Sequence, residues 1–220
     1  EYRQVTKKTN SIFDFSLTQG HKSSQSDADN SRSHFFSNST IDLDFLSFDE
    51  SNLEVQLQKT SNDTYLKLFN FESPLFGEIG SSSVSTLNSF INLTANSDDL
   101  DFTTSVQVYE KLDSGSNDRY EFIFPNYNLN KNIETNNILR GSLSFNSSGS
   151  QHLFNTNVKE TQIINDLLYQ SHDKFFTNGI KNNYNILLKN SNSDGNNSTK
   201  FKNKTQSEML SLFIFETSYP

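Results

Sequence analysis

Histidines, serines and carboxylates are the residue types in this chain that could do chemistry. The four histidines, His21, His34, His152 and His172, stand far apart in the sequence. No two of them form an HxH or HExxH pattern, so a metal centre is not indicated. The patterns GxSxG, GxxxxGK[ST] and GxGxxG do not occur either. The sequence therefore gives no support for a nucleophile elbow or a phosphate-binding loop.

Carboxylates offer two further kinds of chemistry. Neighbouring acids such as Asp98 and Asp99 would do acid–base work only in a pocket that raises one pKa. The acidic-amide segments 26–30 and 192–196 carry oxygens of the kind that Ca²⁺ prefers, but neither has the twelve-residue spacing of an EF-hand. Solvated turns are the simpler interpretation. We expect no catalytic residue, no metal, no cofactor and no enzyme activity.

Composition excludes several classes of protein. Hydrophobic residues make up 32%, which is low for a soluble domain, yet 20 Phe and 8 Tyr are too many for a disordered chain. The net charge of −8 argues against a nucleic-acid partner, and the absence of Cys excludes a disulfide framework. No apolar run approaches the roughly 18 residues of a spanning helix. Strands that cross a membrane need only about 9–11 residues with alternate ones apolar, so this sequence is compatible with membrane-spanning strands.

The elements that would position these residues follow a period of two. Apolar and polar side chains alternate through several segments, which places each kind on its own side of a sheet. The apolar members, predicted to face lipid, are Ile41, Leu43, Phe45, Leu53, Val55, Leu57, Phe102, Val106, Val108, Tyr120, Phe122 and Phe124. The polar members, predicted to face a water-filled lumen, are Asp42, Asp44, Glu54, Gln56, Gln58, Asp101 and Gln107.

Clusters of Asn, Asp, Ser and Gly separate the alternating segments and are typical of hairpin turns. Two stretches differ from this rhythm. Apolar residues between about 160 and 177 recur at helical spacing, which predicts a short helix or a long ordered loop. Residues from about 190 to 199 predict a polar loop. The chain begins at Glu1 and not at Met, so we interpret residues 1–220 as a fragment of a longer protein.

Alternation alone is compatible with a soluble sandwich and with a membrane barrel. The second face is polar in nearly every segment, which suits a wet interior, and closure would remove unpaired edges. The sequence thus favours an all-β, antiparallel transmembrane β-barrel, of which this chain is a part. A soluble secreted β-sandwich or adhesin-type binding module stays open. So does a lipid-cleaving barrel, in which His152 or His172 would have to meet a serine.

Several short motifs, taken in order, resemble one known family. Residues 62–66 (NDTYL) are similar to a D-x-Y-[LF] segment, and 118–125 (DRYEFIFP) resemble a strand end with the pattern YExxxP. The positions that carry the likeness are Asp63, Tyr65, Tyr120 and Pro125. On these residues the chain resembles the lipopolysaccharide-assembly outer-membrane protein family LptD, also called the organic solvent tolerance family, from about Ser31 to its end.

The resemblance implies a large barrel in the outer membrane of Gram-negative bacteria that inserts lipopolysaccharide (LPS) into the outer leaflet without covalent chemistry. It also implies the partners: lipopolysaccharide, an LptE-like plug lipoprotein in the lumen, periplasmic LPS-bridge proteins and outer membrane lipids. The chain would form part of the N-terminal half of the barrel. Basic residues that would meet the lipid phosphates are Lys59, Lys67, Arg119, Arg140 and Lys189.

Overall fold

The computed structural model describes residues 1–19, 31–68, 73, 75, 83–112, 118–135 and 140–219. The strands are β1 (Tyr2–Val5), β2 (Thr9–Thr18), β3 (Arg32–Asp42), β4 (Glu50–Thr60), β5 (Thr86–Ser97), β6 (Leu100–Lys111), β7 (Tyr120–Ile133), β8 (Gly141–Phe154), β9 (Lys159–Ser171), β10 (Lys174–Phe175), β11 (Lys181–Asn196) and β12 (Gln206–Ser218). One four-residue helix, α1 (Tyr65–Leu68), is found among these residues. No helix in this described part is long and apolar enough to cross a bilayer.

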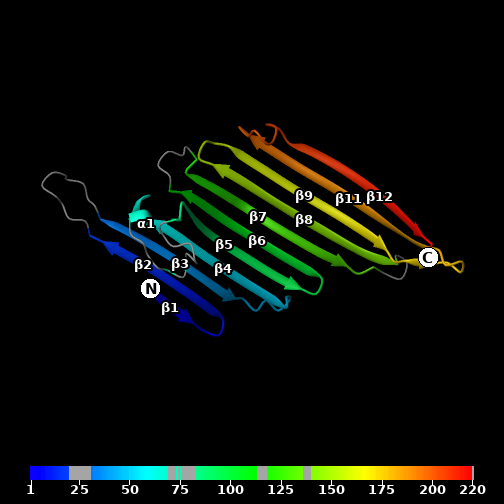
Figure 1. Ribbon diagram of the computed structural model, residues 1–220, viewed down its shortest axis with the longest axis horizontal. Helices are drawn as coiled ribbons and strands as arrows, with labels where there is room; N and C mark the ends of the chain where they lie inside the picture. The colour runs from blue at the N-terminus through cyan, green and yellow to red at the C-terminus, as the bar shows by residue number, and fades with distance from the viewer. Residues whose placement is uncertain are drawn as a thin grey trace.

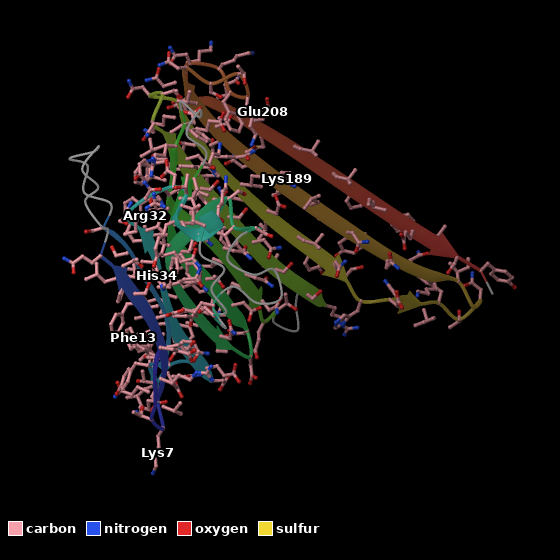
Figure 2. The ribbon with its side chains drawn as sticks, turned by 60° about the vertical axis from the view of Figure 1, so that its left-hand side comes forward. Lys7, Phe13, Arg32, His34, Lys189 and Glu208 are labelled. Carbon is pink, nitrogen blue, oxygen red and sulfur yellow. The ribbon has the colours of Figure 1, made fainter. Side chains whose placement is uncertain are left out.

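All twelve strands belong to one antiparallel sheet, as the alternation predicts. Each strand pairs with its neighbour in the chain, except that β9 pairs with β11 and the short β10 pairs with one end of β11. Figure 1 shows the strands side by side from β1 to β12. Among the described residues no pairing joins β1 or β2 to β12, so the sheet is open. In Figure 2 β2 is seen almost edge-on while β12 runs obliquely, so the sheet is a curved wall.

The connections at the two ends of the sheet differ in length. At one end, the connections in chain order have 3, 7, 2, 7 and 9 residues, the last including β10. At the other end they have 13, 25, 8, 4 and 9 residues, and the connection of 25 residues between β4 and β5 includes α1. We call these the short-turn end and the long-loop end (Figure 1). Positive φ angles fall in turns, at Asp44, Asn157, Gly179 and Asn197, where Asn, Asp and Gly are tolerated.

Among the described residues, the buried apolar side chains that contact one another form a small cluster at the long-loop end. Pairing between β4 and β5 stops at Gln56 and Phe90, although both strands continue. A cluster from β3, α1, β5 and the residue after β6 lies at this end of the sheet: Phe36, Tyr65, Leu66, Leu87 and Leu112. Burial of one such side chain contributes roughly 1.5–3 kcal/mol. The cluster fixes α1 to the sheet.

Strand β7 passes through a proline, Pro125. The pairing shifts between Ile123 and Asn126, so Phe124 and Pro125 together lie opposite single residues on β6 and β8. A bulge of this kind leaves a residue without a ladder partner, which suits proline because proline has no N–H. Pro125 therefore interrupts the ladder, and β7 continues to Ile133.

Two predictions of local structure were wrong. Residues 160–171 are not a helix or loop but belong to β9, which pairs along its length with β8 and β11. The apolar doublets that suggested a helix place Ile163 on one side of the sheet and Ile164 on the other. Residues 190–196 are likewise the last part of β11, and the loop begins only at Asn197. Backbone pairing on both edges of these strands outweighs the local preference of their side chains.

We predict that Gly149→Ala lowers the free energy of unfolding by about 1–3 kcal/mol, the usual cost of overpacking. Gly149 pairs directly with Tyr127, and a Cβ built on Gly149 would lie 2.6 Å from the Cε1 atom of that ring. Unfolding by denaturant measures the change. In a Tyr127→Ala background, Gly149→Ala should leave the free energy of unfolding unchanged. An equal cost in both backgrounds would show that the ring is not the cause.

Candidate functional site

The polar face of the sheet collects most of the polar residues selected from the sequence. Side chains of directly paired residues lie on the same side of a sheet, so the register assigns faces across all strands. One side carries six of the seven predicted lumen residues: Asp42, Glu54, Gln56, Gln58, Asp101 and Gln107. Their side chains bond across strands; Asn38 Nδ2 donates to Glu54 Oε1 at 3.0 Å and to Gln56 Oε1 at 3.3 Å.

A polar track crosses six neighbouring strands on this face. Its members are paired in one hydrogen-bonded line: Asn96, Asp101, Asn130, Asn146, Asp166 and Lys189. The only ion pair along this line is between Lys189 Nζ and Asp166 Oδ2, at 3.2 Å. Amides and carboxylates spaced in this way offer many donors and acceptors to hydroxyl groups. Lys189, predicted to meet phosphate, is thus already paired with a carboxylate.

The opposite face is apolar and partly exposed. It carries Ile41, Leu53, Val55, Leu57, Phe102, Val106, Val108, Tyr120 and Phe122. Phe124 lies in the β7 bulge opposite Val106, and its side chain is 56% exposed. Leu43, Asp44 and Phe45 follow the last residue of β3, so the predicted alternation was wrong for these three. Their segment turns at Asp44, where φ is 48°. The lumen and lipid assignments stay predictions.

At the long-loop end, an ionic cluster joins the segment before α1 to β4, β6 and β7. Glu110 is buried and accepts hydrogen bonds from Lys59 Nζ at 2.7 Å, Arg119 Nη2 at 2.7 Å and Tyr120 Oη at 2.8 Å. Arg119 also donates from both terminal nitrogens to Asp63, at 3.0 and 2.6 Å. Hydrogen bonds to Glu110 and Asp63 raise the pKa of the Arg119 guanidinium above its ordinary value. We call these five residues the clamp.

The clamp changes the interpretation of residues selected from the sequence. Asp63 and Tyr120, positions of the family resemblance, are 57 residues apart yet meet on Arg119 and Glu110. Lys59 and Arg119 were candidates for phosphate, but each is held by carboxylates. The sequence contains no local sign of this cluster, because its members come from four separate segments. The clamp positions the loop segment and is not itself a catalytic arrangement.

Beside the clamp, a buried hydrogen-bond network links β2, β3 and α1. Ser16 Oγ lies 3.2 Å from His34 Nδ1, and Asp14 Oδ1 lies 3.5 Å from His34 Nε2. Ser16 Oγ also shares a hydrogen bond with the hydroxyl of Tyr65, another position that carries the family resemblance. The His34 side chain is only 1% exposed, with the Phe36 ring stacked at 4.7 Å. Figure 2 labels His34 on this part of the sheet.

Serine, histidine and aspartate at these distances resemble the parts of a hydrolase site. The surroundings favour another role, because the imidazole is enclosed and the serine hydroxyl is shared with Tyr65. We interpret this network as the polar counterpart of the apolar cluster, holding α1 on the sheet. The lipid-cleaving alternative required a serine at His152 or His172. His152 Nδ1 instead lies 2.9 Å from Glu121 Oε1.

Other candidates from the sequence give no site. Residues 26–30 and His21 lie outside the described residues, and 192–196 form the end of β11. Within the part of the chain that the structure describes, no three His, Asp or Glu side chains are arranged to hold a metal. No protein-family model matches the chain, and no curated protein matches it. The two faces of the sheet and its long-loop end are therefore the features that bear on function.

We expect Arg119→Lys to destabilise the protein by about 1 kcal/mol, because lysine keeps the charge but loses the forked bonds to Asp63. Limited proteolysis should then cut within 61–68 faster, and denaturant unfolding measures the stability. The matched control is Lys131→Gln, which breaks an exposed ion pair with Asp99 at the short-turn end. This control should leave both readouts unchanged, because exposed pairs contribute little. Equal effects of the two changes would contradict the role of the clamp.

Proposed function

We propose that this chain forms part of the wall of an outer-membrane β-barrel that takes part in the assembly of lipopolysaccharide at the cell surface. One observation carries the barrel: a band of partly exposed apolar side chains crosses one face of the sheet, and the band runs at a slant to the lines of paired residues. On β4 to β8 the opposite face is mostly polar, whereas on β9, β11 and β12 it also carries apolar residues: Ile164, Leu168, Leu187, Leu210, Leu212 and Ile214. A wall with lipid on one side and water on the other has this pattern.

The slant is visible when paired residues are followed across the sheet. Val108 and Phe122 lead to Leu153 and then to Lys159 and Asn196, so this line is apolar on β6 to β8 and polar on β9 and β11. The apolar band therefore leaves this line between β8 and β9, toward the short-turn end.

A second line shows the reverse change. Ile186 and Tyr169 lead to Leu143 and Ile133, a line that is apolar from β11 to β7. Beyond β7 this line reaches the polar β5–β6 turn, where Asn132 N–H donates to the carbonyl of Asp99 at 2.8 Å. The band thus lies nearer the long-loop end on β6 and nearer the short-turn end on β11.

The amount of slant fits a barrel. The band moves by about one to one and a half residues per strand, which at ~3.4 Å per residue and ~4.8 Å between strands is a tilt of roughly 35–45°. Strands of membrane barrels are inclined to the barrel axis by about the same angle. The flat surface of a bilayer meets each tilted strand at a different position along the strand. The slant therefore supports insertion of this wall in a membrane.

Connection lengths support one orientation. Barrels of bacterial outer membranes have short periplasmic turns and longer extracellular loops. The connections of 13 and 25 residues would place the long-loop end, with α1 and the clamp, at the cell surface. The short-turn end would then face the periplasm.

The lipopolysaccharide part of the proposal rests on the family resemblance together with the polar face. Three of the four positions that carry the resemblance lie at the long-loop end: Asp63 and Tyr120 in the clamp, and Tyr65 in the His34 network. The fourth, Pro125, lies in the bulge of β7. The polar track offers hydrogen bonds to sugar hydroxyls along the wall. A soluble β-sandwich is the alternative. Among the described strands, however, none lies over the apolar face as a second layer.

Substitution with Arg on the two faces tests the bilayer. Ile91 lies on the apolar face with 49% exposure, and its neighbour Asn92 lies on the polar face. In a membrane, Ile91→Arg should cost about 2–4 kcal/mol, because a charge is brought to the hydrocarbon, whereas Asn92→Arg should cost little. Folding titrations into vesicles measure both. If Ile91→Arg were as well tolerated as Asn92→Arg, the apolar face would be in water and the barrel would be excluded.

Labelling with cysteine tests the orientation, because the natural chain has no Cys. Lys202→Cys lies in the loop between β11 and β12 at the long-loop end, and Lys7→Cys lies in the β1–β2 turn at the other end. A maleimide that does not cross membranes should label Lys202→Cys on intact cells. It should label Lys7→Cys only after the outer membrane is opened. The opposite pattern would reverse the orientation, and labelling of neither on opened cells would contradict surface exposure of both turns.

A further inference from the structure

A hollow lies on the polar face where β7, β8 and β9 run side by side. Its volume is about 150 Å³, and it is lined by five residues of that face, Asn126, Ser148, Ser150, Gln162 and Ile164, and by Tyr127 and Gly149, which alternate with them. Ser150 pairs with Asn126 on one side and with Gln162 on the other. Ser148, in the next line, pairs with Ile164. The two serines on β8 are shorter than the side chains beside them, so the wall is concave at this point.

The polar groups of the hollow have few partners within the protein. Among the described residues, the hydroxyls of Ser148 and Ser150 and the side-chain amide of Gln162 make no hydrogen bond with another protein group. The side chain of Asn126 makes one, in which its Nδ2 lies 3.4 Å from Ser105 Oγ. Two hydroxyls and two amides therefore offer neutral donors and acceptors to one small space.

No charged residue lines the hollow, and the charges around it exclude an anion. The ionisable residues around it on the polar face of β7 to β12 are Glu121, His152, Glu160, Asp166, Lys189 and Glu208. The two basic members are each held by a carboxylate: Lys189 Nζ lies 3.2 Å from Asp166 Oδ2, and His152 Nδ1 lies 2.9 Å from Glu121 Oε1. Figure 2 labels Lys189 and Glu208. A phosphate would require an Arg or Lys that is free to bind it, and here it would meet carboxylates instead.

A neutral ring that carries hydroxyl groups fits these side chains. The volume is well below the roughly 300–1,000 Å³ of pockets for drug-sized ligands, so there is room for a single ring. The donors and acceptors suit its hydroxyl groups, and Ile164 suits its C–H groups. An acyl chain would leave the two serine hydroxyls without partners. A peptide strand would need a free edge of the sheet, and β7, β8 and β9 are paired on both edges.

We propose that the hollow binds one neutral hexopyranose ring of a saccharide in the lumen, with hydroxyls of the ring bonded to Ser148, Ser150 and Gln162. This proposal rests on the proposed function, because only the wall of a barrel has this face in a lumen. It also narrows that function. Of the sugars in a lipopolysaccharide, the hollow would take a neutral one and would reject phosphorylated or acidic ones, which the surrounding carboxylates repel.

Saturation-transfer NMR on the full chain, folded in a detergent without sugar groups, tests the site. The probes are D-glucose, D-galactose and D-mannose, with glucose 6-phosphate as the anionic counterpart. We expect at least one of the three hexoses to bind and glucose 6-phosphate not to bind. Gln162→Ala should weaken binding of that hexose about tenfold, because a charge-free donor and acceptor are lost. Ser150→Leu, which fills the hollow, should abolish it. The matched controls are Gln170→Ala and Ser144→Leu, on the same face of β9 and β8 but outside the hollow, and both should bind as the natural protein does.

The outcomes separate this proposal from the proposed function. If none of the three hexoses binds, or if Gln162→Ala binds them as well as Gln170→Ala does, the hollow is not a sugar site and this inference fails. The Ile91→Arg and labelling results decide membrane insertion independently. A deacylated lipopolysaccharide that ends in neutral hexoses identifies the source of the sugar. Its binding, lost in Gln162→Ala, would support both proposals. Binding of the free hexose alone would keep the hollow as a sugar site and contradict the lipopolysaccharide part of the proposed function.

Discussion

Hydrogen bonding of the backbone between neighbouring strands is the interaction on which the rest of this structure depends. The described residues bury only seven hydrophobic side chains, so no large apolar interior holds the sheet together. Twelve strands are joined instead by a ladder that runs from β1 to β12. A buried backbone group without a partner is costly, and in hydrocarbon it costs several kcal/mol. A continuous ladder is therefore the first requirement for a stable sheet, and the side chains of both faces are positioned by it.

The same constraint explains where irregular residues are tolerated. Pro125 has no N–H to offer, and it occupies the bulge at which β7 leaves one residue without a ladder partner. Gly149 lies under the ring of Tyr127, which covers the backbone that a larger side chain would have covered. Packing of the kind found in soluble proteins is confined to the long-loop end. There the apolar cluster, the His34 network and the clamp together fix α1 where β4 and β5 separate.

Once the ladder exists, function becomes a question of what covers each face. A polar track and an apolar band lie on opposite sides of the same strands, so water and a second, apolar phase would each meet one of them. The proposed barrel wall supplies both environments, with sugar hydroxyls on the polar side and acyl chains on the apolar side. None of these roles needs a catalytic residue.

Sequence alone determined that Val55 and Gln56, or Val106 and Gln107, lie on opposite faces, because a strand alternates its side chains whatever its neighbours are. It also predicted an all-β antiparallel sheet, which the structure confirms. It was wrong for Ile163 and Ile164, since an apolar doublet fits a helix as well as a strand that is apolar on both faces. Only the tertiary structure decided the register, and with it the slant of the band and the clamp. These depend on which residues pair across strands far apart in the chain, and local sequence carries no record of that choice.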